Sequence, residues 1–158
     1  MTLALPKDRD VAAFLRDLLD RPVKVGRGKP ERVGKRVKGS CGLYRNDDGS
    51  LAAAWVCDHG FGSSAGAALS LIAPAAATDM LKTDGMSTGP LNENLSEVFN
   101  IGASLFNDGD VHVRFTEMIV DDKLPDDVAT SIKGTKRRLD LAIDVGGYAG
   151  GQVSVFAF

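Results

Sequence analysis

Cysteine is scarce in this chain of 158 residues, which contains only Cys41 and Cys57. Two cysteines are too few for a disulfide framework, and neither has histidine or acidic neighbours at the spacing of a zinc site. Both are therefore expected to be small apolar fillers. Such usage is typical of the reducing cytoplasm, where we expect the protein to reside.

Long apolar runs are absent as well. The apolar start Met1–Pro6 is too short for a signal peptide, and Lys7 and Asp8 follow at once. No stretch approaches the roughly 18 to 20 apolar residues that a membrane helix requires. We therefore expect no membrane association.

An excess of one charge is also missing, since 19 Lys and Arg stand against 21 Asp and Glu, a net charge of −2. Such a balance produces no overall field toward nucleic acid, so no nucleic-acid partner is expected. The composition is 44% hydrophobic and 25% charged, which is ordinary for a soluble globular protein. This length suits one domain over residues 1–158, and no internal repeat or long linker interrupts it.

Helical and strand-like patterns alternate along the chain. In the first half they predict a helix from Asp8 or Asp10 to about Asp20, a short strand at 23–25, a hairpin of strands 41–45 and 51–57, a helix ending near Ala73 and another from Pro74. In the second half they predict a helix over Pro90–Asn107, a turn at 107–110, a strand at 111–116, a turn or cap at 125–127 and a hairpin of strands 139–145 and 152–158.

This order predicts an α+β domain in which helices cover one face of an antiparallel sheet. The final hairpin ends the chain, so its last strand is a candidate for pairing across a dimer edge. Whether the protein forms a homodimer stays open.

The segment Pro90–Asn107 is predicted to be the most regular helix, with one apolar and one polar face. At about 100° per residue, the apolar positions within about 40° of Leu91 are Leu95, Val98, Gly102 and Leu105. A polar wedge about 60° wide lies opposite and contains Glu93, Glu97, Asn100 and Ser104.

Neither glutamate nor asparagine is an obvious choice for stabilising this helix. Glu93 and Glu97 are like charges four residues apart, which is slightly unfavourable, and Asn100 is a mediocre helix former. Presentation of the polar wedge to another protein is therefore our interpretation. The alternative explanation is an ordinary solvated helix face.

Residues Leu95–Asn107 resemble the signature helix of the CheC/CheX/FliY family of chemotaxis phosphatases. That helix carries Glu, two intervening residues and Asn, commonly followed by an Ile–Gly pair, and here the matching residues are Glu97, Asn100, Ile101 and Gly102. The family often has Asp or Ser four residues before the Glu, where this chain has Glu93. Only one such helix is present, which indicates the CheX-like form. The family's downstream proline has no counterpart at the usual spacing, so Pro125 receives no role.

The resemblance implies hydrolysis of an aspartyl phosphate on a CheY-like response regulator. Asn100 would orient the attacking water, and Glu97 would pair with the regulator's active-site lysine. Glu93 and Ser104 would be partner contacts at the rim. No cofactor is expected in this chain, because the Mg²⁺ belongs to the regulator. The alternative is a non-catalytic CheX-like module for binding or dimerisation in a two-component or chemotaxis pathway.

Two further patterns point to other chemistry. Arg32 and Arg36, followed by Asp48-x-Ser50, resemble the cyclic di-GMP motif of PilZ domains, but Ala53 replaces the final glycine and the chain has too much helix for a β-barrel. A solvated loop therefore explains the basic segment Lys24–Lys38 better.

The tripeptide Cys57–His59 suggests a nucleophile or a metal site, yet adjacent residues of a strand point to opposite faces. The segment Gly60–Gly66 lacks the Gly-Lys-Ser/Thr ending of a phosphate-binding loop, so its small residues are expected to permit tight helix packing.

Overall fold

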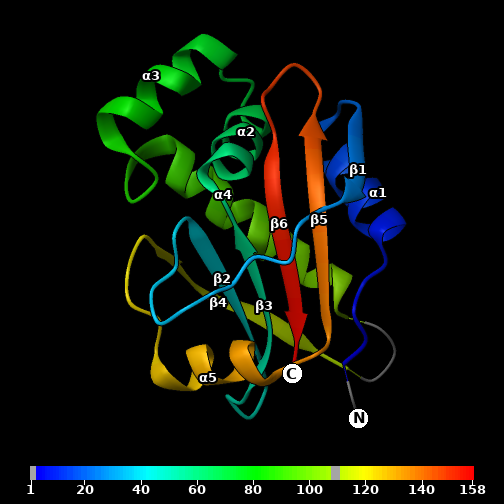
Figure 1. The fold of residues 1–158 in the computed structure, drawn as a ribbon. Coiled ribbons are helices and arrows are strands. Elements are labelled where there is room, and N and C mark those ends of the chain that lie inside the picture. The colour runs from blue at the N-terminus through cyan, green and yellow to red at the C-terminus, as the bar shows by residue number, and fades with distance from the viewer. Residues whose placement is uncertain (1–2, 108–110) are drawn as a thin grey trace.

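The computed structural model describes residues 3–107 and 111–158 (Figure 1). Its elements are α1 (Asp8–Leu19), β1 (Val23–Arg27), β2 (Ser40–Asn46), β3 (Leu51–Cys57), α2 (His59–Leu69), α3 (Pro74–Asp84), α4 (Gly89–Ile101), a 3₁₀ turn η1 (Gly102–Leu105), β4 (Val113–Val120), α5 (Asp126–Gly134), β5 (Arg138–Val145) and β6 (Gly151–Ala157). The predicted helices and strands are thus all present, but some ends differ: α2 ends at Leu69 instead of near Ala73, and the strand predicted at 111–116 runs over Val113–Val120. Residues 108–110 of the predicted turn at 107–110 lie outside the described residues.

The strands form one six-stranded sheet in the order β1-β5-β6-β3-β2-β4, and every pairing is antiparallel. The helices α1, α2 and α4 cover one face of this sheet, as the α+β prediction requires, and α3 packs against α2 and α4 beyond the end of the strands (Figure 1). The C-terminal hairpin β5–β6 lies inside the sheet, because β5 pairs with β1 and β6 pairs with β3. The prediction that the last strand is available to a dimer partner is therefore wrong, since both of its sides are occupied.

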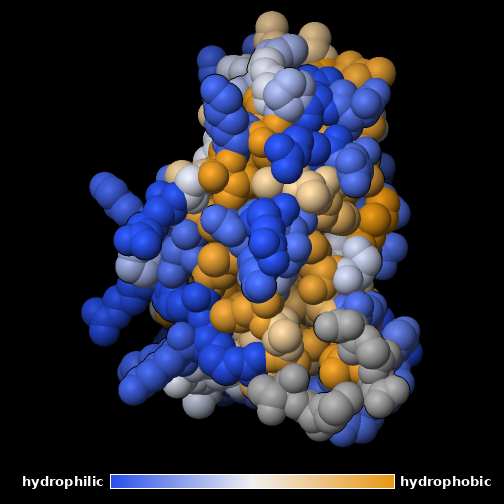
Figure 2. All heavy atoms as spheres, turned by 90° about the vertical axis from the view of Figure 1, so that its right-hand side faces the viewer, coloured by the Kyte–Doolittle hydropathy of each residue, from blue (hydrophilic) through white to orange (hydrophobic). Residues whose placement is uncertain are grey.

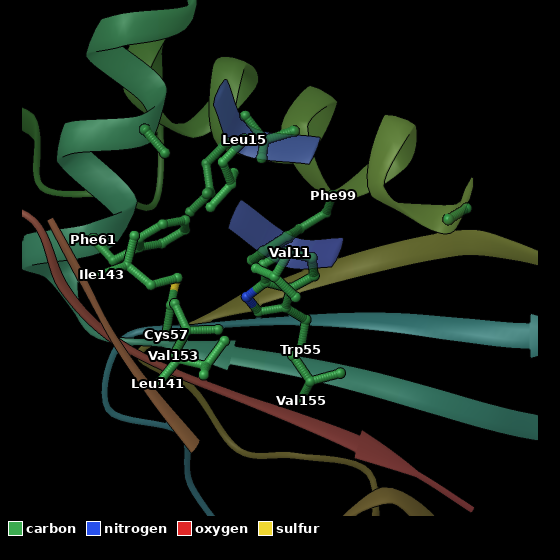
Figure 3. Packing of buried hydrophobic residues seen from close by; sticks show 14 of the residues in the cluster. Val11, Leu15, Trp55, Cys57, Phe61, Phe99, Leu141, Ile143, Val153 and Val155 are labelled. Atoms are coloured by element: carbon green, nitrogen blue, oxygen red, sulfur yellow. The ribbon is translucent and has the colours of Figure 1, made fainter. Parts of the chain in front are cut away.

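The main core lies between the sheet and helices α1, α2 and α4 (Figure 3). Trp55 of β3 is fully buried at its centre, with the ring centroid of Phe99 from α4 at 5.6 Å and that of Phe61 from α2 at 6.5 Å. Because strand residues alternate in direction, Trp55 and Cys57 face this core while Ala54 and Val56 face away from it.

A second, smaller core lies on the opposite face of the sheet, where α5 crosses in front in Figure 1. Val128 and Ile132 of α5 pack there against the sheet residues Leu43 and Phe156. The sequence patterns did not predict this helix. Its nine residues contain only one pair of apolar residues at i and i+4, which is too few to show a helical period. Pro125, predicted as a turn or cap, is its N-cap residue.

Helix α4 is shorter than the predicted range Pro90–Asn107, since regular α-helix ends at Ile101 and a 3₁₀ turn follows. The hydroxyl of Tyr44 donates a hydrogen bond of 2.6 Å to the carbonyl of Phe99, one of the last carbonyls of the helix. A Cβ atom on Gly102 would lie only 3.4 Å from the ring of Trp55. The C-terminal end of α4 is therefore held directly against the centre of the core.

Candidate functional site

Helix α4 divides into a buried face and an exposed face, as its residue pattern predicts. Its fully buried side chains are Leu91, Leu95, Val98 and Phe99. The exposed face carries all four residues of the predicted wedge, namely Glu93, Glu97, Asn100 and Ser104. Ser104 lies in the 3₁₀ turn rather than in the α-helix and is exposed there too. We call these four residues the polar stripe.

Three asparagines of α4 differ in what their side chains do. The amide of Asn92 donates to the carbonyl of Met86 at 2.8 Å, and that of Asn94 donates to the carbonyl of Gly66 and to the hydroxyl of Ser70, both at 2.8 Å. Asn100 is exposed, and its amide makes no hydrogen bond within the described part of the chain. Two of these amides therefore hold the helix in place, while the third is available to a partner.

The glutamates of the stripe are similarly free. Glu93 and Glu97 are exposed, and neither forms an ion pair or a side-chain hydrogen bond with any residue that the structure describes. Glu97 and Asn100 are three residues apart, so their side chains are neighbours on the helix surface, with Cβ atoms about 5 to 6 Å apart. The carboxylate of Glu97 and the amide of Asn100 are thus neighbours on α4, and neither is paired within the described residues. The opposite face of the helix is buried in the core.

Two large apolar side chains are exposed in the described residues, one next to Asn100 in the chain and one just after α2, which packs against α4. Ile101 directly follows Asn100 and is 39% exposed. Leu71 is 76% exposed and follows Ser70, whose hydroxyl accepts the hydrogen bond from Asn94 on α4. The sequence analysis did not identify either residue as part of a site. The Ile–Gly pair of the signature was an available signal for Ile101, whereas no local pattern indicates Leu71.

The backbone at Leu71 adds to the case that this residue has a function. After α2 ends, Leu71 adopts a left-handed conformation with φ of 57°. Its N–H donates to the carbonyl of Ala68, and that of Ile72 donates to Ala67, which is the Schellman arrangement that usually has glycine at this position. Neither burial nor backbone preference favours leucine here. A contact with a partner supplies a reason for it.

The tripeptide Cys57–His59 forms no joint site. Burial raises the pKa of the Cys57 thiol well above its usual value. Asp58 is the N-cap of α2, accepting hydrogen bonds from the N–H groups of Phe61 at 2.8 Å and Gln152 at 3.0 Å. The Nε2 atom of His59 lies 2.7 Å from a carboxylate oxygen of Asp121. Each of the three side chains has its own structural environment, so they do not act together.

The buried thiols lead to a prediction about reactivity. Burial raises the pKa of Cys41 to about 12, and Cys57 is shifted in the same direction. Because the thiolate is the nucleophile, we expect neither residue to react with iodoacetamide in the folded protein at pH 8, and both to react in denaturant. Mass spectrometry of the alkylated protein measures this. Rapid labelling of either cysteine in the native state would contradict the burial.

The glycine-rich segment serves helix packing, as its composition predicts. A Cβ atom on Gly66 of α2 would lie 2.8 Å from the carbonyl oxygen of Leu91, and one on Gly62 would lie 3.1 Å from Leu95, both on α4. These glycines allow the two helices to approach closely. The segment therefore positions α4 and does not form a phosphate-binding loop.

The residues that resemble a PilZ motif do not form a joint site. Arg36 donates to the carbonyl of Asp121 and pairs with Asp122, while Asp48 and Ser50 bond to each other within the β2–β3 turn. The open six-stranded sheet is not a β-barrel.

Within residues 3–107 and 111–158, no group of three or more His, Cys, Asp or Glu side chains is placed to hold a metal ion. The helices of the same residues are also short, and none has the length and apolar composition needed to cross a bilayer.

The six-stranded antiparallel sheet with helices on one face is an α+β fold, and a solved structure that contains CheX is similar to it. Among solved structures, the chain matches one in the crystal structure of the CheX–CheY–BeF₃–Mg²⁺ complex from Borrelia burgdorferi, with a TM-score of 0.50 and 14% identity over 90% of this chain and 88% of that chain. At this identity the likeness concerns the fold alone.

Two FliM middle domains are also similar. That from Vibrio alginolyticus has a TM-score of 0.45 and 12% identity over 95% of this chain and 88% of that one. That from H. pylori has a TM-score of 0.48 and 7% identity over 95% and 84%. No known protein family's sequence profile and no curated protein sequence matches the chain.

Proposed function

We propose that this protein is an aspartyl-phosphate phosphatase that acts on a CheY-like response regulator. The observation that carries the proposal is the pair Glu97 and Asn100, exposed and unpaired among the described residues, on one helix of a CheX-like fold. The structural neighbour from Borrelia burgdorferi, which is a complex of CheX with CheY, BeF₃ and Mg²⁺, supports a CheY-like partner.

Asn100 is assigned the placement of water. Hydrolysis of a phosphoaspartate requires a water molecule in line with the bond that breaks, and a primary amide offers both a donor and an acceptor for holding it. The Asn100 amide makes no hydrogen bond within the described residues, whereas the amides of Asn92 and Asn94 donate to groups of the fold. Holding water in the reactive geometry lowers the barrier by removing orientational entropy from the step, so no perturbed acid or base is needed in this chain.

Glu97 is assigned to docking. A carboxylate on this stripe pairs with the active-site lysine of the regulator and sets the register in which Asn100 enters. Glu93 and Ser104 contact the regulator at the rim, where exposed charges contribute less. The Mg²⁺ that balances the phosphoryl charge belongs to the regulator.

Ile101 and Leu71 are assigned the apolar part of the same interface. We expect Ile101→Ser to raise the Kd for a regulator saturated with BeF₃⁻ and Mg²⁺ about tenfold, because an apolar side chain near the centre of an interface contributes on the order of 1 to 2 kcal/mol. Isothermal titration calorimetry measures this. The matched control is Ile119→Ser on the opposite face of the sheet, which should leave the Kd within about twofold if binding is local to α4. Equal weakening by both variants would indicate a loss of folding instead.

The decisive experiment is phosphate release from a panel of phosphorylated response regulators, with and without the wild-type protein. We expect release from at least one regulator to exceed its spontaneous rate. If no regulator that binds the protein is dephosphorylated faster than it is alone, the phosphatase proposal fails and the non-catalytic alternative stands.

That alternative is a CheX-like module that binds a regulator or a second copy of itself without hydrolysis. The structure offers an edge for self-association at β4, one of the two edge strands of the sheet, where Met118, Ile119 and Val120 are only half buried. An edge strand presents unpaired backbone groups to which a second sheet can bind. If a homodimer forms by strand pairing, β4 is the better candidate than the C-terminal hairpin.

A further inference from the structure

A second concave site lies on the face of the sheet opposite α4. It is a hollow of about 590 Å³ between the loop at 28–39, helix α5 and the start of β5. Its lining includes Arg32, Val33, Lys35, Ile132, Lys133 and Arg138. We call this hollow the basic pocket. Figure 2 is turned so that this face of the sheet points left, and hydrophilic side chains project from that side.

The ionisable residues that line the basic pocket are all cationic: Arg32, Lys35, Lys133 and Arg138. Asp140 binds Arg138 of the pocket itself at 2.7 Å, Asp122 pairs with Arg36 and Asp127 pairs with Arg45, while Glu31 next to Arg32 in the chain is exposed. Within the described residues, Arg32, Lys35 and Lys133 form no ion pair. Arg32, Lys35 and Lys133 are exposed, so the pocket carries three solvated positive charges, and an anion that binds there is attracted by all three.

Arg138 differs from the other three cations because it is held rigidly. Its guanidinium donates to both carboxylate oxygens of Asp140 and to the carbonyl of Glu31, and it stacks over the ring of Phe156 at 4.7 Å. These contacts join the loop at 28–39 to the sheet. The contacts of Arg138 therefore fix one side of the basic pocket, although the loop at 28–39 has little regular secondary structure.

The floor of the basic pocket is apolar. Ile132 is buried there, while Val33 and Ala129 are half buried and pack against the second core. The side chain of Thr130 is exposed beside them. An inorganic anion alone would leave this apolar floor unused, whereas a ligand with both a flat organic body and a charged end would use both parts. The volume lies within the range of about 300 to 1,000 Å³ that is typical of small-molecule sites.

We propose that the basic pocket binds a nucleotide of the nucleoside diphosphate class. The three uncompensated cations match the roughly three negative charges of a diphosphate at neutral pH, and arginine suits phosphate oxygens through bidentate hydrogen bonds. The base lies on the apolar floor formed by Val33, Ala129 and Ile132. The site is independent of the proposed phosphatase function, because α4 packs against the main core on one face of the sheet, whereas α5, which lines the basic pocket, packs against the second core on the opposite face.

The test is calorimetric titration of the full chain with ADP, adenosine and inorganic phosphate, each as a separate arm. We expect ADP to bind, with an affinity that falls as salt is raised, and the other two ligands to bind at least about tenfold more weakly. The charge-reversal variant Arg32→Glu/Lys133→Glu should weaken ADP binding by at least about tenfold. The matched control Arg16→Glu/Lys82→Glu changes the same total charge on exposed residues of α1 and α3, and it should bind ADP as the wild type does.

Three results would overturn the proposal. The first is no binding of ADP to the wild type at millimolar concentration. The second is equal weakening by the two double variants, which would indicate a general charge effect and no site. The third is inorganic phosphate binding as tightly as ADP, which would remove the role of the apolar floor. Circular dichroism melting of both variants confirms that each is folded before it is titrated.

Discussion

Asn100→Ala is expected to lower the rate of regulator dephosphorylation by about 10²-fold while leaving the Kd for the regulator within about twofold. Loss of one positioning group in a preorganised site typically costs a factor of this size. Binding is expected to survive because we assign the docking contacts to Glu97, Ile101 and Leu71. Stability should also survive, since the side chain is exposed and makes no hydrogen bond within the described residues.

The same helix provides a matched control in Asn94→Ala. Asn94 donates two hydrogen bonds of 2.8 Å to α2, so its removal should lower the free energy of unfolding by about 1 to 2 kcal/mol and leave the dephosphorylation rate unchanged. The two asparagines therefore have opposite expected signatures. Single-turnover phosphate release and urea unfolding measure both quantities. A full rate with Asn100→Ala, while binding persists, would disprove the assigned water placement.

Phe99→Ala is expected to lower the free energy of unfolding by about 3 to 5 kcal/mol, the largest effect on stability that we predict for this helix. Phe99 is fully buried, with ring centroids 5.6 Å from Trp55 and 6.4 Å from Phe115. Opposite the ring, Gly42 of β2 leaves the space that it fills, since a Cβ atom there would lie 2.7 Å from the ring. Gly42 itself has no side chain with which to fill the resulting cavity.

Urea denaturation followed by tryptophan fluorescence measures this loss, because Trp55 is the only tryptophan and lies beside Phe99. The control is Ile101→Ala, two residues further along α4, which should cost less than about 1.5 kcal/mol because the side chain is already 39% exposed. A loss below about 1.5 kcal/mol for Phe99→Ala would mean that the end of α4 is not anchored by this packing. The rigid support assigned to Asn100 would then be absent.

The features that the sequence predicted correctly are those in which neighbouring residues carry the information. The 3.6-residue period of Leu91, Leu95 and Val98 defined the buried face of α4, and the exposed stripe followed from it. The turn at 46–49 between two strand patterns predicted the β2–β3 hairpin. Periodicity reports burial along a single element, so it succeeds wherever one element has enough residues to show it.

The features that the sequence missed depend on which distant segments meet. Periodicity did not reveal that β6 pairs with β3, so the hairpin was misplaced at an edge. Helix α5 was too short for a pattern, and Leu71 gave no local signal of exposure. The basic pocket arises because the loop at 28–39 lies beside a helix about 100 residues later.

The sequence by itself determined that α4 carries Glu97 and Asn100 on its polar side, because helical geometry turns a spacing of three residues into adjacency. Within the described residues, the tertiary structure alone decided that this side is exposed, that Asn100 makes no side-chain hydrogen bond where Asn94 makes two, and that Ile101 and Leu71 are exposed as well. These facts depend on the packing of α4 against α2 and the sheet. The hydrophobic periodicity of one element shows which of its faces is buried, but it does not show which distant element packs against that face.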